Sequence, residues 1–498
     1  MPRSRLGARG RPRCPAPGFE REPGRGPRGR RSRPLPISSV LGPGGDLHDR
    51  APWRFDHLGL ESGGQTPQGA RRRDLRGGCR HEGRRPLPSG AASSVPSDVG
   101  SCDPIAWRAI RTDVHTIRAR LWEDLNRLRS REGYLRAGSP RYSTLFGRDS
   151  LISAWQTLQL DPSIAAATLR VLASYQGRRV DWKSEEEPGK ILHEHRFDLA
   201  SQRELPDWSF PYYGSIDSTP LFLIVADEYV AKTGMRSIID ELWGAIEAAH
   251  HWMIEFGDPD GDGYLEYARK NPLGLFHQGW KDGSADHLRI APPVAMIEVQ
   301  GYAIAAHWAY ARLARLRGMV DAAERAEDLG KQIRIALNRD FWMSHSQFFA
   351  LALDGSKRPR DAITSNPGHL LVVDAMPPER VDALVGRLFA EDMWTPYGIR
   401  THASSEPDFD PYGYHTGAIW PHDNWFFYKG LRAHGRDSDA RRIRDALLRT
   451  WEELGKMPEA YAVVDGTLED LSQEGSRTPA NPLQAWSSAG LLDMISEE

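Results

Sequence analysis

The distribution of hydrophobic and polar residues along the chain changes near residue 103. Beyond this point apolar residues recur at the i, i+3, i+4 and i+7 positions that are typical of helices with one buried face. Loops rich in Gly, Pro, Asp and aromatic residues separate these stretches, and almost no run alternates with the period of a β-strand. The pattern predicts about a dozen helices. We place them at residues 103–130, 150–160, 162–177, 218–233, 236–256, 294–317, 320–340, 378–390, 423–434, 437–454 and 482–496.

Many amphipathic helices in succession can form either a solenoid or a closed ring of helix pairs. A helical solenoid requires a fixed repeat of about 30 to 45 residues with a recurring motif, and none is visible. The pattern therefore predicts an all-α fold, an (α/α)6 barrel of the six-hairpin type. In such a barrel we expect the loops at one end to carry the functional residues, because function commonly resides in loops on a rigid scaffold.

Residues 1–102 have a different composition from the rest of the chain. They are crowded with Arg, Pro and Gly, and no Lys occurs before Lys183. They contain few aliphatic residues and no sustained period, so they cannot bury enough surface to offset chain entropy. We predict a disordered extension at 1–102, followed by one barrel domain at 103–498. The excess of Arg also suggests nucleic-acid binding. We favour an unstructured tail, or a start codon assigned too early in a GC-rich gene.

The charge and cysteine content limit the classes of function. The formal net charge is −2 while the first segment is basic, so the remainder is acidic. An acidic body suits a neutral, polyhydroxylated substrate better than a phosphate backbone, and we predict no nucleic-acid partner. No apolar run of about 20 residues occurs, which predicts a cytoplasmic protein without a membrane partner. Cys14, Cys79 and Cys102 lie in or at the edge of the first segment, which excludes disulfides and thiolate metal sites from the remainder.

The segment RYSTLFGRDS at 141–150 is the first that suggests a site. Arg148 and Asp149 stand directly before a predicted helix, where a carboxylate can cap backbone N–H groups. Both can instead bond the hydroxyl groups of a sugar, with Tyr142 and Phe146 as apolar walls. A helix cap paired with Arg148 remains the structural alternative.

The segment QGWKDG at 278–283 carries a candidate catalytic acid. A glycosidase needs a carboxylic acid that stays protonated until it donates to the leaving oxygen. Asp282 lies next to Trp280, whose bulk would desolvate it and raise its pKa, whereas Lys281 would act in the opposite direction. An ordinary polar turn is the alternative.

The segment KMPEAY at 456–461 carries a second candidate carboxyl. Glu459 follows Pro458 after a long predicted helix, a position from which a carboxylate can point into a pocket. The alternative is an exposed glutamate at a helix end.

The loop GYHTGAIWPHDN at 413–424 has an unusual density of ring and polar side chains. It contains His415, Trp420, His422 and Asp423. Packing alone explains this density poorly. We therefore predict a stacking platform with several hydrogen-bonding groups for a substrate.

Two segments resemble metal sites without meeting their requirements. DPDGDG at 258–263 is similar to the start of a calcium loop, but the twelfth position is Arg269 rather than Glu. In HEH at 193–195, the two histidines would lie on opposite sides of a helix, and no third ligand is evident. Sugar contacts or loop hydrogen bonds are the preferred interpretation of HEH. Since no phosphate-binding loop occurs either, we predict neither a metal nor any other cofactor.

Taken together, these motifs resemble the bacterial amylo-α-1,6-glucosidase and glycogen-debranching-like proteins, which are related in fold to glycoside hydrolase families 15, 63 and 133. The resemblance covers about residues 104–490. It rests on eleven segments in order: FGRDSLISA, EEEPGKILHEHR, YYGSIDSTPLFL, DGDGYLEY, QGWKDG, EVQGY, SNPGH, GIRT, YHTGAIWPHDN, MPEAY and PLQAW. Many relatives carry a β-rich domain ahead of the barrel, where this chain has its Arg-rich segment.

The resemblance implies roles for individual residues. Asp282 matches the general acid of such enzymes and Glu459 the general base. The residues that match sugar-binding positions of the first subsite are Arg148, Asp149, Asp217, Trp280, His415 and Trp420. Further substrate contacts are predicted for Tyr142, Phe146, His193, Glu194, Tyr213, Gln278, Lys281, His422 and Asp423.

These features predict an inverting glycoside hydrolase that releases a terminal sugar from an α-glucoside or α-glucan. Inverting enzymes hold their two carboxyl groups about 6.5–9.5 Å apart to admit water. Three alternatives remain: a sugar epimerase or isomerase that would use His415 and His422, a phosphorylase, and a non-catalytic carbohydrate-binding protein.

Overall fold

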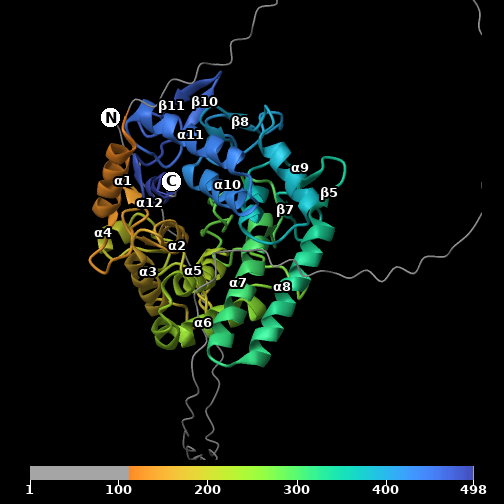
Figure 1. Ribbon diagram of the computed structural model, residues 1–498. Helices are drawn as coiled ribbons and strands as arrows, with labels where there is room; N and C mark the ends of the chain where they lie inside the picture. Colours follow the sequence, from red (N-terminus) through yellow and green to blue (C-terminus); the bar gives the residue numbers. More distant parts are fainter. Residues whose placement is uncertain (1–111, 497–498) are drawn as a thin grey trace, which may run out of the picture. The chain divides into compact units, whose positions relative to one another are not determined.

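Two layers of helices make up the part of the chain that the structure, a computed structural model, describes, residues 112–496. The chain alternates between an outer and an inner helix, and Figure 1 shows the outer helices at the rim. The outer helices are α1 (Val114–Leu128), α3 (Pro162–Ser174), α6 (Ser237–Glu255), α8 (Val320–Asp340), α9 (Pro378–Leu388) and α11 (Asp437–Leu454). The inner elements are α2 (Gly147–Gln156), α5 (Ser218–Thr233), α7 (Ile297–Leu316), the 3-10 helix η1 (Asn366–Val372), α10 (Pro421–Ala433) and α12 (Ala485–Met494).

The inner elements form a closed ring. Each packs on the next in chain order, from α2 through α5, α7, η1 and α10 to α12, and α12 packs back on α2. The first helix, α1, packs on the last, α12, so the two ends of the described chain meet. This arrangement confirms the predicted (α/α)6 barrel.

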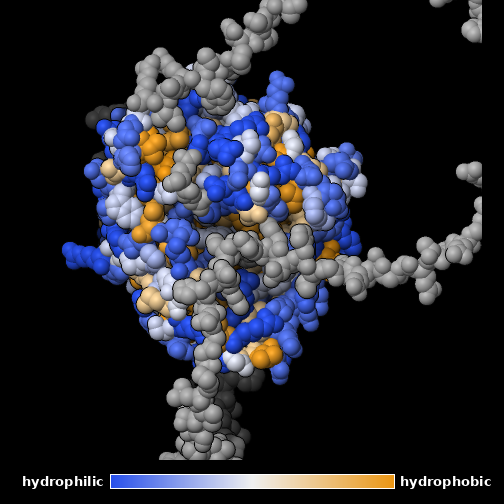
Figure 2. Space-filling view, viewed as in Figure 1, coloured by the Kyte–Doolittle hydropathy of each residue, from blue (hydrophilic) through white to orange (hydrophobic). Residues whose placement is uncertain are grey.

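Burial explains which helices lie inside. Every residue of α12 is buried, as are most of those in α5 and α7, because each inner helix has neighbours on all sides. The outer helices α8 and α11 bury one stripe and expose charged residues on the other face, the pattern of a surface helix. Figure 2 shows the result, a mostly hydrophilic face with scattered hydrophobic patches.

The structure confirms the ten predicted helices that lie wholly among the described residues, within a few residues at each end. It adds two short elements that the pattern did not indicate, η1 and α4 (Leu199–Gln202). No helix in residues 112–496 combines the length and apolarity that crossing a bilayer requires. The predicted extension at 1–102, and the start of the first predicted helix, lie outside the described residues.

Six short antiparallel strand pairs tie the loops together within residues 112–496. Three of them join segments distant in sequence beside inner helices: β1 with β12, β2 with β3, and β4 with β7. The full set is β1 (Gly138–Ser139) with β12 (Leu483–Gln484), β2 (Leu145–Phe146) with β3 (Glu194–His195), β4 (Ala295–Met296) with β7 (Ala352–Leu353), β5 (Trp342–Met343) with β6 (Phe348–Phe349), β8 (Trp394–Thr395) with β9 (Gly398–Ile399), and β10 (Ala462–Val464) with β11 (Thr467–Glu469).

Because inner and outer helices alternate, all inner helices begin at the same end of the ring. A helix N-terminus has unsatisfied N–H groups and a partial positive charge, which favours nearby carboxylates. Three of the inner helices carry an acidic residue in their first turn, namely Asp149 in α2, Glu298 in α7 and Asp423 in α10. This end of the ring is therefore suited to hold buried carboxyl groups.

The contact between α10 and η1 leaves no room for a side chain at Gly430. A Cβ at this position would lie 2.2 Å from Leu371 Cβ. We expect Gly430→Ala to lower the free energy of unfolding by about 1–3 kcal/mol, the usual cost of overpacking. Gly386 on α9 offers a matched control, because a Cβ there meets nothing within 4 Å. Gly386→Ala should raise stability by up to about 1 kcal/mol through helix propensity. Scanning calorimetry of both variants tests the difference, and equal melting temperatures would contradict this account.

Candidate active site

The guanidinium of Arg148, in the first turn of α2, joins two carboxyl groups at the N-terminal end of the ring. Its Nη1 donates to both oxygens of Asp217, at 3.2 and 3.1 Å, and to Gly279 O at 3.1 Å. Its Nη2 donates to Asp282 Oδ2 at 2.7 Å. Asp217 precedes α5 and is fully buried, so it fixes Arg148 in place. The helix cap considered as the structural alternative is not what the structure shows: the N-cap residue of α2 is Phe146, without a side-chain cap bond, and Arg148 pairs with Asp217 and Asp282.

Asp282 lies in the loop before β4 with one oxygen engaged and one available. Oδ2 accepts from Arg148, whereas Oδ1 accepts from none of the described residues, and the side chain keeps 27% of its surface exposed. Burial raises the pKa of Asp282, and the adjacent Arg148 opposes that shift. His193 Nε2 lies 4.0 Å from Oδ2, and burial holds the pKa of His193 well below its usual value, so this imidazole is neutral. Asp282 therefore combines an open oxygen with a pKa above its ordinary value.

Glu459 lies in the loop after α11 and is almost completely buried. Its Oε2 accepts the N–H of Asn481 at 2.8 Å, and the hydroxyl of Tyr414 donates to the same carboxyl. Burial raises the pKa of Glu459 to about 7, in part offset by these two hydrogen bonds. The negative charge of Asp282 raises it further.

The two carboxyl groups belong to one site. Asp149, Tyr142 and Tyr414 each interact electrostatically with both Asp282 and Glu459. Burial and these two neighbours raise the pKa of Asp149 to about 7. Like charges at close range disfavour ionisation of the whole group, so the carboxyls titrate as a coupled set.

Aromatic rings from two segments, QGWKDG and the loop at 413–424, pack against one another. Trp280 meets the edge of Trp420, with ring centroids 5.7 Å apart, and His415 stacks on Trp420 at 5.4 Å. Trp420 Nε1 donates to Tyr414 O at 2.6 Å, which couples this platform to the residue that bonds Glu459. His415 Nε2 is buried and bonds none of the described residues. The structure thus brings Trp280, His415 and Trp420 together in a common aromatic wall.

Tyr142 and Phe146 form a second pair of aromatic rings. Their rings meet at 5.5 Å, and Phe146 meets His193 at 5.4 Å. Tyr142 is 38% exposed, whereas Phe146 is buried. These two residues thus lie beside Arg148 and Asp149.

Three of the residues predicted to contact the substrate are buried and bond or stack with other protein groups. Asp423 Oδ1 is 2.6 Å from His369 Nε2, and Lys281 Nζ donates to Thr401 O at 2.8 Å. His422 is fully buried and stacks on Trp486 at 3.9 Å. Burial lowers the pKa of Lys281. These three side chains therefore contact other protein groups rather than the open part of the site.

Three other predicted residues are engaged by protein partners. Glu194 forms an ion pair with Arg196, and Gln278 Nε2 donates to Glu185 Oε2 at 2.7 Å. Tyr213 points away from the two carboxyls, because its hydroxyl donates to Tyr175 O at 2.6 Å. Its neighbour Tyr212 lies nearer the site, 5.9 Å from the His193 ring.

Four residues of the site were not predicted from sequence. Tyr414 and Asn481 bond Glu459, and Gln484 Nε2 donates to Asp149 Oδ1 at 3.0 Å. Glu298 is fully buried on α7, and burial raises its pKa to about 7. Tyr414, Gln484 and Glu298 lie inside segments that carry the family resemblance. The resemblance assigned no role to these three residues. Asn481 lies outside those segments.

The two segments that resembled metal sites have other partners. The ammonium of Lys357 lies 2.9 Å from Asp260 and 2.7 Å from Asp262 and also pairs with Glu266. The ammonium group of Lys357 therefore lies among the carboxylates that would otherwise bind a metal cation. HEH at 193–195 lies partly in strand β3 rather than in a helix, so the argument from opposite helix sides does not apply.

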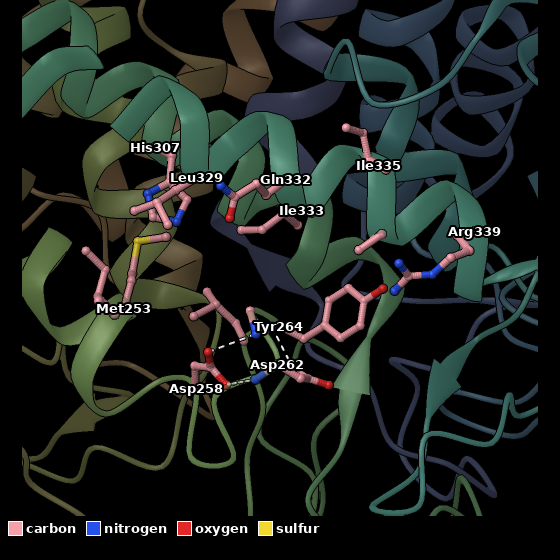
Figure 3. A pocket seen from close by; sticks show the side chains of 14 residues that line it. Met253, Asp258, Asp262, Tyr264, His307, Leu329, Gln332, Ile333, Ile335 and Arg339 are labelled. Carbon is pink, nitrogen blue, oxygen red and sulfur yellow. Dashed lines mark hydrogen bonds between the residues drawn. The ribbon is translucent and has the colours of Figure 1, made fainter. Parts of the chain in front are cut away.

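A separate cavity of about 370 Å³ lies between the outer helices α6 and α8. Figure 3 shows the side chains of α8 facing Tyr264 and the loop that carries Asp258 and Asp262. Met253 and Ile333 contribute apolar walls. None of the carboxyls described above as part of the site lines this cavity, so it is distinct from the candidate active site.

Comparison with known proteins identifies the family. Residues 142–478 match the family of the mannosylglycerate hydrolase MGH1-like glycoside hydrolase domain. A search of curated proteins finds no match.

Solved structures share the fold at low sequence identity. A mannosylglycerate hydrolase of glycoside hydrolase family 63 from Thermus thermophilus, in complex with Tris, matches with a TM-score of 0.57 and 16% identity, covering 77% of this chain and all of that one. The same enzyme in complex with glucose matches equally. A wild-type glycosidase matches with a TM-score of 0.55, 16% identity and coverage of 77% of this chain and 96% of its own. Because the family match spans more than half of the sequence, this chain belongs to the MGH1-like glycoside hydrolases.

Proposed function

We propose that the chain is an inverting α-glycosidase in which Asp282 is the general acid and Glu459 the general base. One observation carries this proposal. Two carboxyls, Glu459 buried and Asp282 partly exposed, share a set of neighbours, burial raises the pKa of both, and of the two only Asp282 has an arginine on one of its oxygens. Unequal environments for two carboxyls are typical of an acid and base pair, and the resemblance of QGWKDG and MPEAY, rather than the order of the two pKa values, assigns Asp282 as the acid.

The reaction then follows from the contacts of each carboxyl. The proton on Asp282 passes to the glycosidic oxygen as the bond to the anomeric carbon breaks. Arg148 stabilises the carboxylate that this transfer leaves on Asp282. On the opposite face of the sugar, Glu459 takes a proton from water, and the hydroxide oxygen bonds to the anomeric carbon. The configuration at that carbon is inverted, and we expect a carboxyl separation of about 6.5–9.5 Å.

Substrate contacts are proposed for the residues with groups open to the site. Asp149 and Arg148 would bond hydroxyl groups, while Trp280, Trp420 and His415 would pack on the sugar ring. Phe146 and Tyr142 would cover its other side. The predicted action in the cytoplasm stays a prediction.

For the substrate, we propose an α-linked mannose or glucose on a small hydroxy acid of the glycerate kind. The description of the family, and the mannosylglycerate hydrolase with the same fold, support this choice. A carboxylate on the leaving group also suits Arg141, an exposed cation whose charge acts on both Glu459 and Tyr142.

A second candidate is release of terminal glucose from an α-glucan, as in the amylo-α-1,6-glucosidase-like proteins. The order of the eleven shared segments favours it. Both candidates use the same two carboxyls and differ only in the leaving group.

A substrate panel followed by NMR tests the proposal. Mannosylglycerate, glucosylglycerate, isomaltose, panose and methyl α-glycosides are each incubated with the full chain. We expect a glycosylglycerate to be cleaved fastest, with the β-anomer of the sugar appearing first. First release of the α-anomer would refute inversion. Cleavage that needs inorganic phosphate would show a phosphorylase, epimerisation without cleavage an epimerase, and binding without turnover a carbohydrate-binding protein.

The proposed role of Arg141 gives a separate prediction. Arg141→Gln should raise KM for a glycosylglycerate by about 10-fold, since a charged hydrogen-bonded pair is typically worth about 1.5–3 kcal/mol. The KM for a neutral methyl α-glycoside should change little. Steady-state kinetics on both substrates measures the difference, with Arg339→Gln on α8 as a control. An equal rise for both substrates would contradict the assignment.

A further inference from the structure

The main chain of Asn481 fixes the orientation of Glu459. The N–H of Glu459 donates to Asn481 O at 2.9 Å, and the N–H of Asn481 donates to Glu459 Oε2 at 2.8 Å. Because both bonds run between the same two residues, a movement of Asn481 turns the Glu459 carboxylate. The position of Asn481 therefore decides where this carboxylate points.

The side chain of Asn481 is in turn held on both sides. It is almost completely buried, and its Oδ1 accepts the N–H of Arg141 at 3.1 Å. Its Nδ2 donates to Gln484 Oε1 at 3.2 Å. This one amide thus ties the segment that positions Glu459 to the chain ahead of α2 and to strand β12, which leads into α12.

Gln484 extends the chain of hydrogen bonds to a second carboxyl. It is fully buried, and its Nε2 donates to Asp149 Oδ1 at 3.0 Å. Strand β1 packs tightly on it, since a Cβ at Gly138 would lie 2.0 Å from Gln484 Oε1. Only a glycine at position 138 therefore fits beside this amide.

The direction of every bond in this chain is determined. The N–H of Arg141 can only donate, so Asn481 presents its oxygen there and its nitrogen to Gln484. Gln484 then presents its oxygen to Asn481 and its nitrogen to Asp149. Asp149 Oδ1 must therefore accept, and any proton on this carboxyl is confined to Oδ2, the oxygen left for a substrate.

We propose that Asn481 and Gln484 are positioning residues that hold Glu459 and Asp149 as one hydrogen-bonded unit between α2 and α12. This inference rests on the proposed function of Glu459. The two amides act through the carboxyls and are not themselves catalytic residues. Their effect is to aim the base at the attacking water and to set its strength.

The strength of the base gives the inference a specific signature. The N–H of Asn481 lowers the pKa of Glu459 against the effect of burial. If a substitution removes the side-chain hydrogen bonds of Asn481, the bond from its N–H to Glu459 weakens and the pKa of Glu459 rises. A base works only when ionised, so activity then begins at higher pH.

The test compares three variants of the full chain on the best substrate of the panel. In Asn481→Ser, kcat should fall at least about 10-fold with KM nearly unchanged, as for groups that act in the transition state. The acidic limb of the kcat/KM profile should move to higher pH. In Gln484→Glu, two carboxyls would face each other and share one proton, so a new basic limb should appear.

Asn338→Ser on α8 is the matched control. The Asn338 amide is likewise held by hydrogen bonds, since it donates to Arg334 O and Ala375 O and accepts from Arg380 Nη1, far from Glu459 in the sequence. It should lower the melting temperature without moving the pH profile. Unchanged profiles in both Asn481→Ser and Gln484→Glu, with wild-type kcat, would overturn the inference.

A second readout separates this inference from the proposed function. The carboxyl pKa of Glu459 is measured by ¹³C NMR titration, with Glu459→Gln providing the assignment. A higher pKa in Asn481→Ser supports the positioning role even if no panel substrate is cleaved. An unchanged pKa in a folded variant contradicts it.

Discussion

Asp282→Asn is expected to lower kcat by about 10²–10⁴-fold, the usual contribution of a general acid. The amide keeps the shape of the carboxyl and can still accept from Arg148, but it has no proton of suitable acidity to give. Binding of the sugar should persist, because the hydroxyl contacts proposed for Asp149 and the aromatic wall stay in place. Steady-state kinetics and product titration on the same protein separate the two effects.

The dependence on the leaving group sharpens this test. A glycoside with an acidic leaving group, such as a nitrophenol, departs without protonation, so Asp282→Asn should lose much less activity on it than on a glycosylglycerate. Asp286→Asn, four residues further along, is the control, since Asp286 pairs with His277 and takes no part in the hydrogen bonds of Arg148. If Asp282→Asn kept near wild-type turnover on an alkyl glycoside, another group would have to be the acid.

The helices were predictable because their signal is local. An outer helix such as α11 has apolar residues at helical spacing among charged ones, and an inner helix such as α5 is bounded by a Gly in the left-handed region after its last residue. The 3-10 helix η1 escaped because it has only seven residues and contains Pro367 and Gly368, which are typical of a loop. Its place in the ring follows from contacts with α7 and α10, which no local pattern records.

Residues of the site were predictable where one short motif indicates their chemical role. Asp282 and the aromatic residues around it come from compact segments, and the structure brings them together. The choice between Tyr212 and Tyr213 was beyond the sequence, since adjacent residues point to opposite sides and only the fold decides which faces the site. Asn481 and Gln484 gave no chemical signal, because an amide acquires a role only through the partners that the fold supplies. The contact between β1 and β12, about 340 residues apart in sequence, creates these partners.

Glu459→Gln should reduce kcat by a similar factor, about 10²–10⁴-fold, and for a different reason. The amide is close in shape but cannot accept the proton that the attacking water must lose. The hydrogen bond from Asn481 can remain, so the loop should keep its conformation. Glu469→Gln, on the exposed strand β11, is a matched control for the loss of one negative charge in the same part of the chain.

The pH profile distinguishes a base from a group that merely binds substrate. Burial raises the pKa of Glu459 to about 7, and the base must be ionised to work, so wild-type kcat/KM should rise with pH up to about 7. It should fall again where Asp282, whose pKa burial also raises, loses its proton. Because the two carboxyls interact, both limbs belong to the coupled pair. Removing the charge of Glu459 should abolish the acidic limb of the profile. It should also shift the basic limb to lower pH, because Asp282 then loses its proton more easily. A Glu459→Gln variant that kept both limbs would exclude Glu459 as the base and leave Asp149, the third carboxyl of the site, as the residue to test.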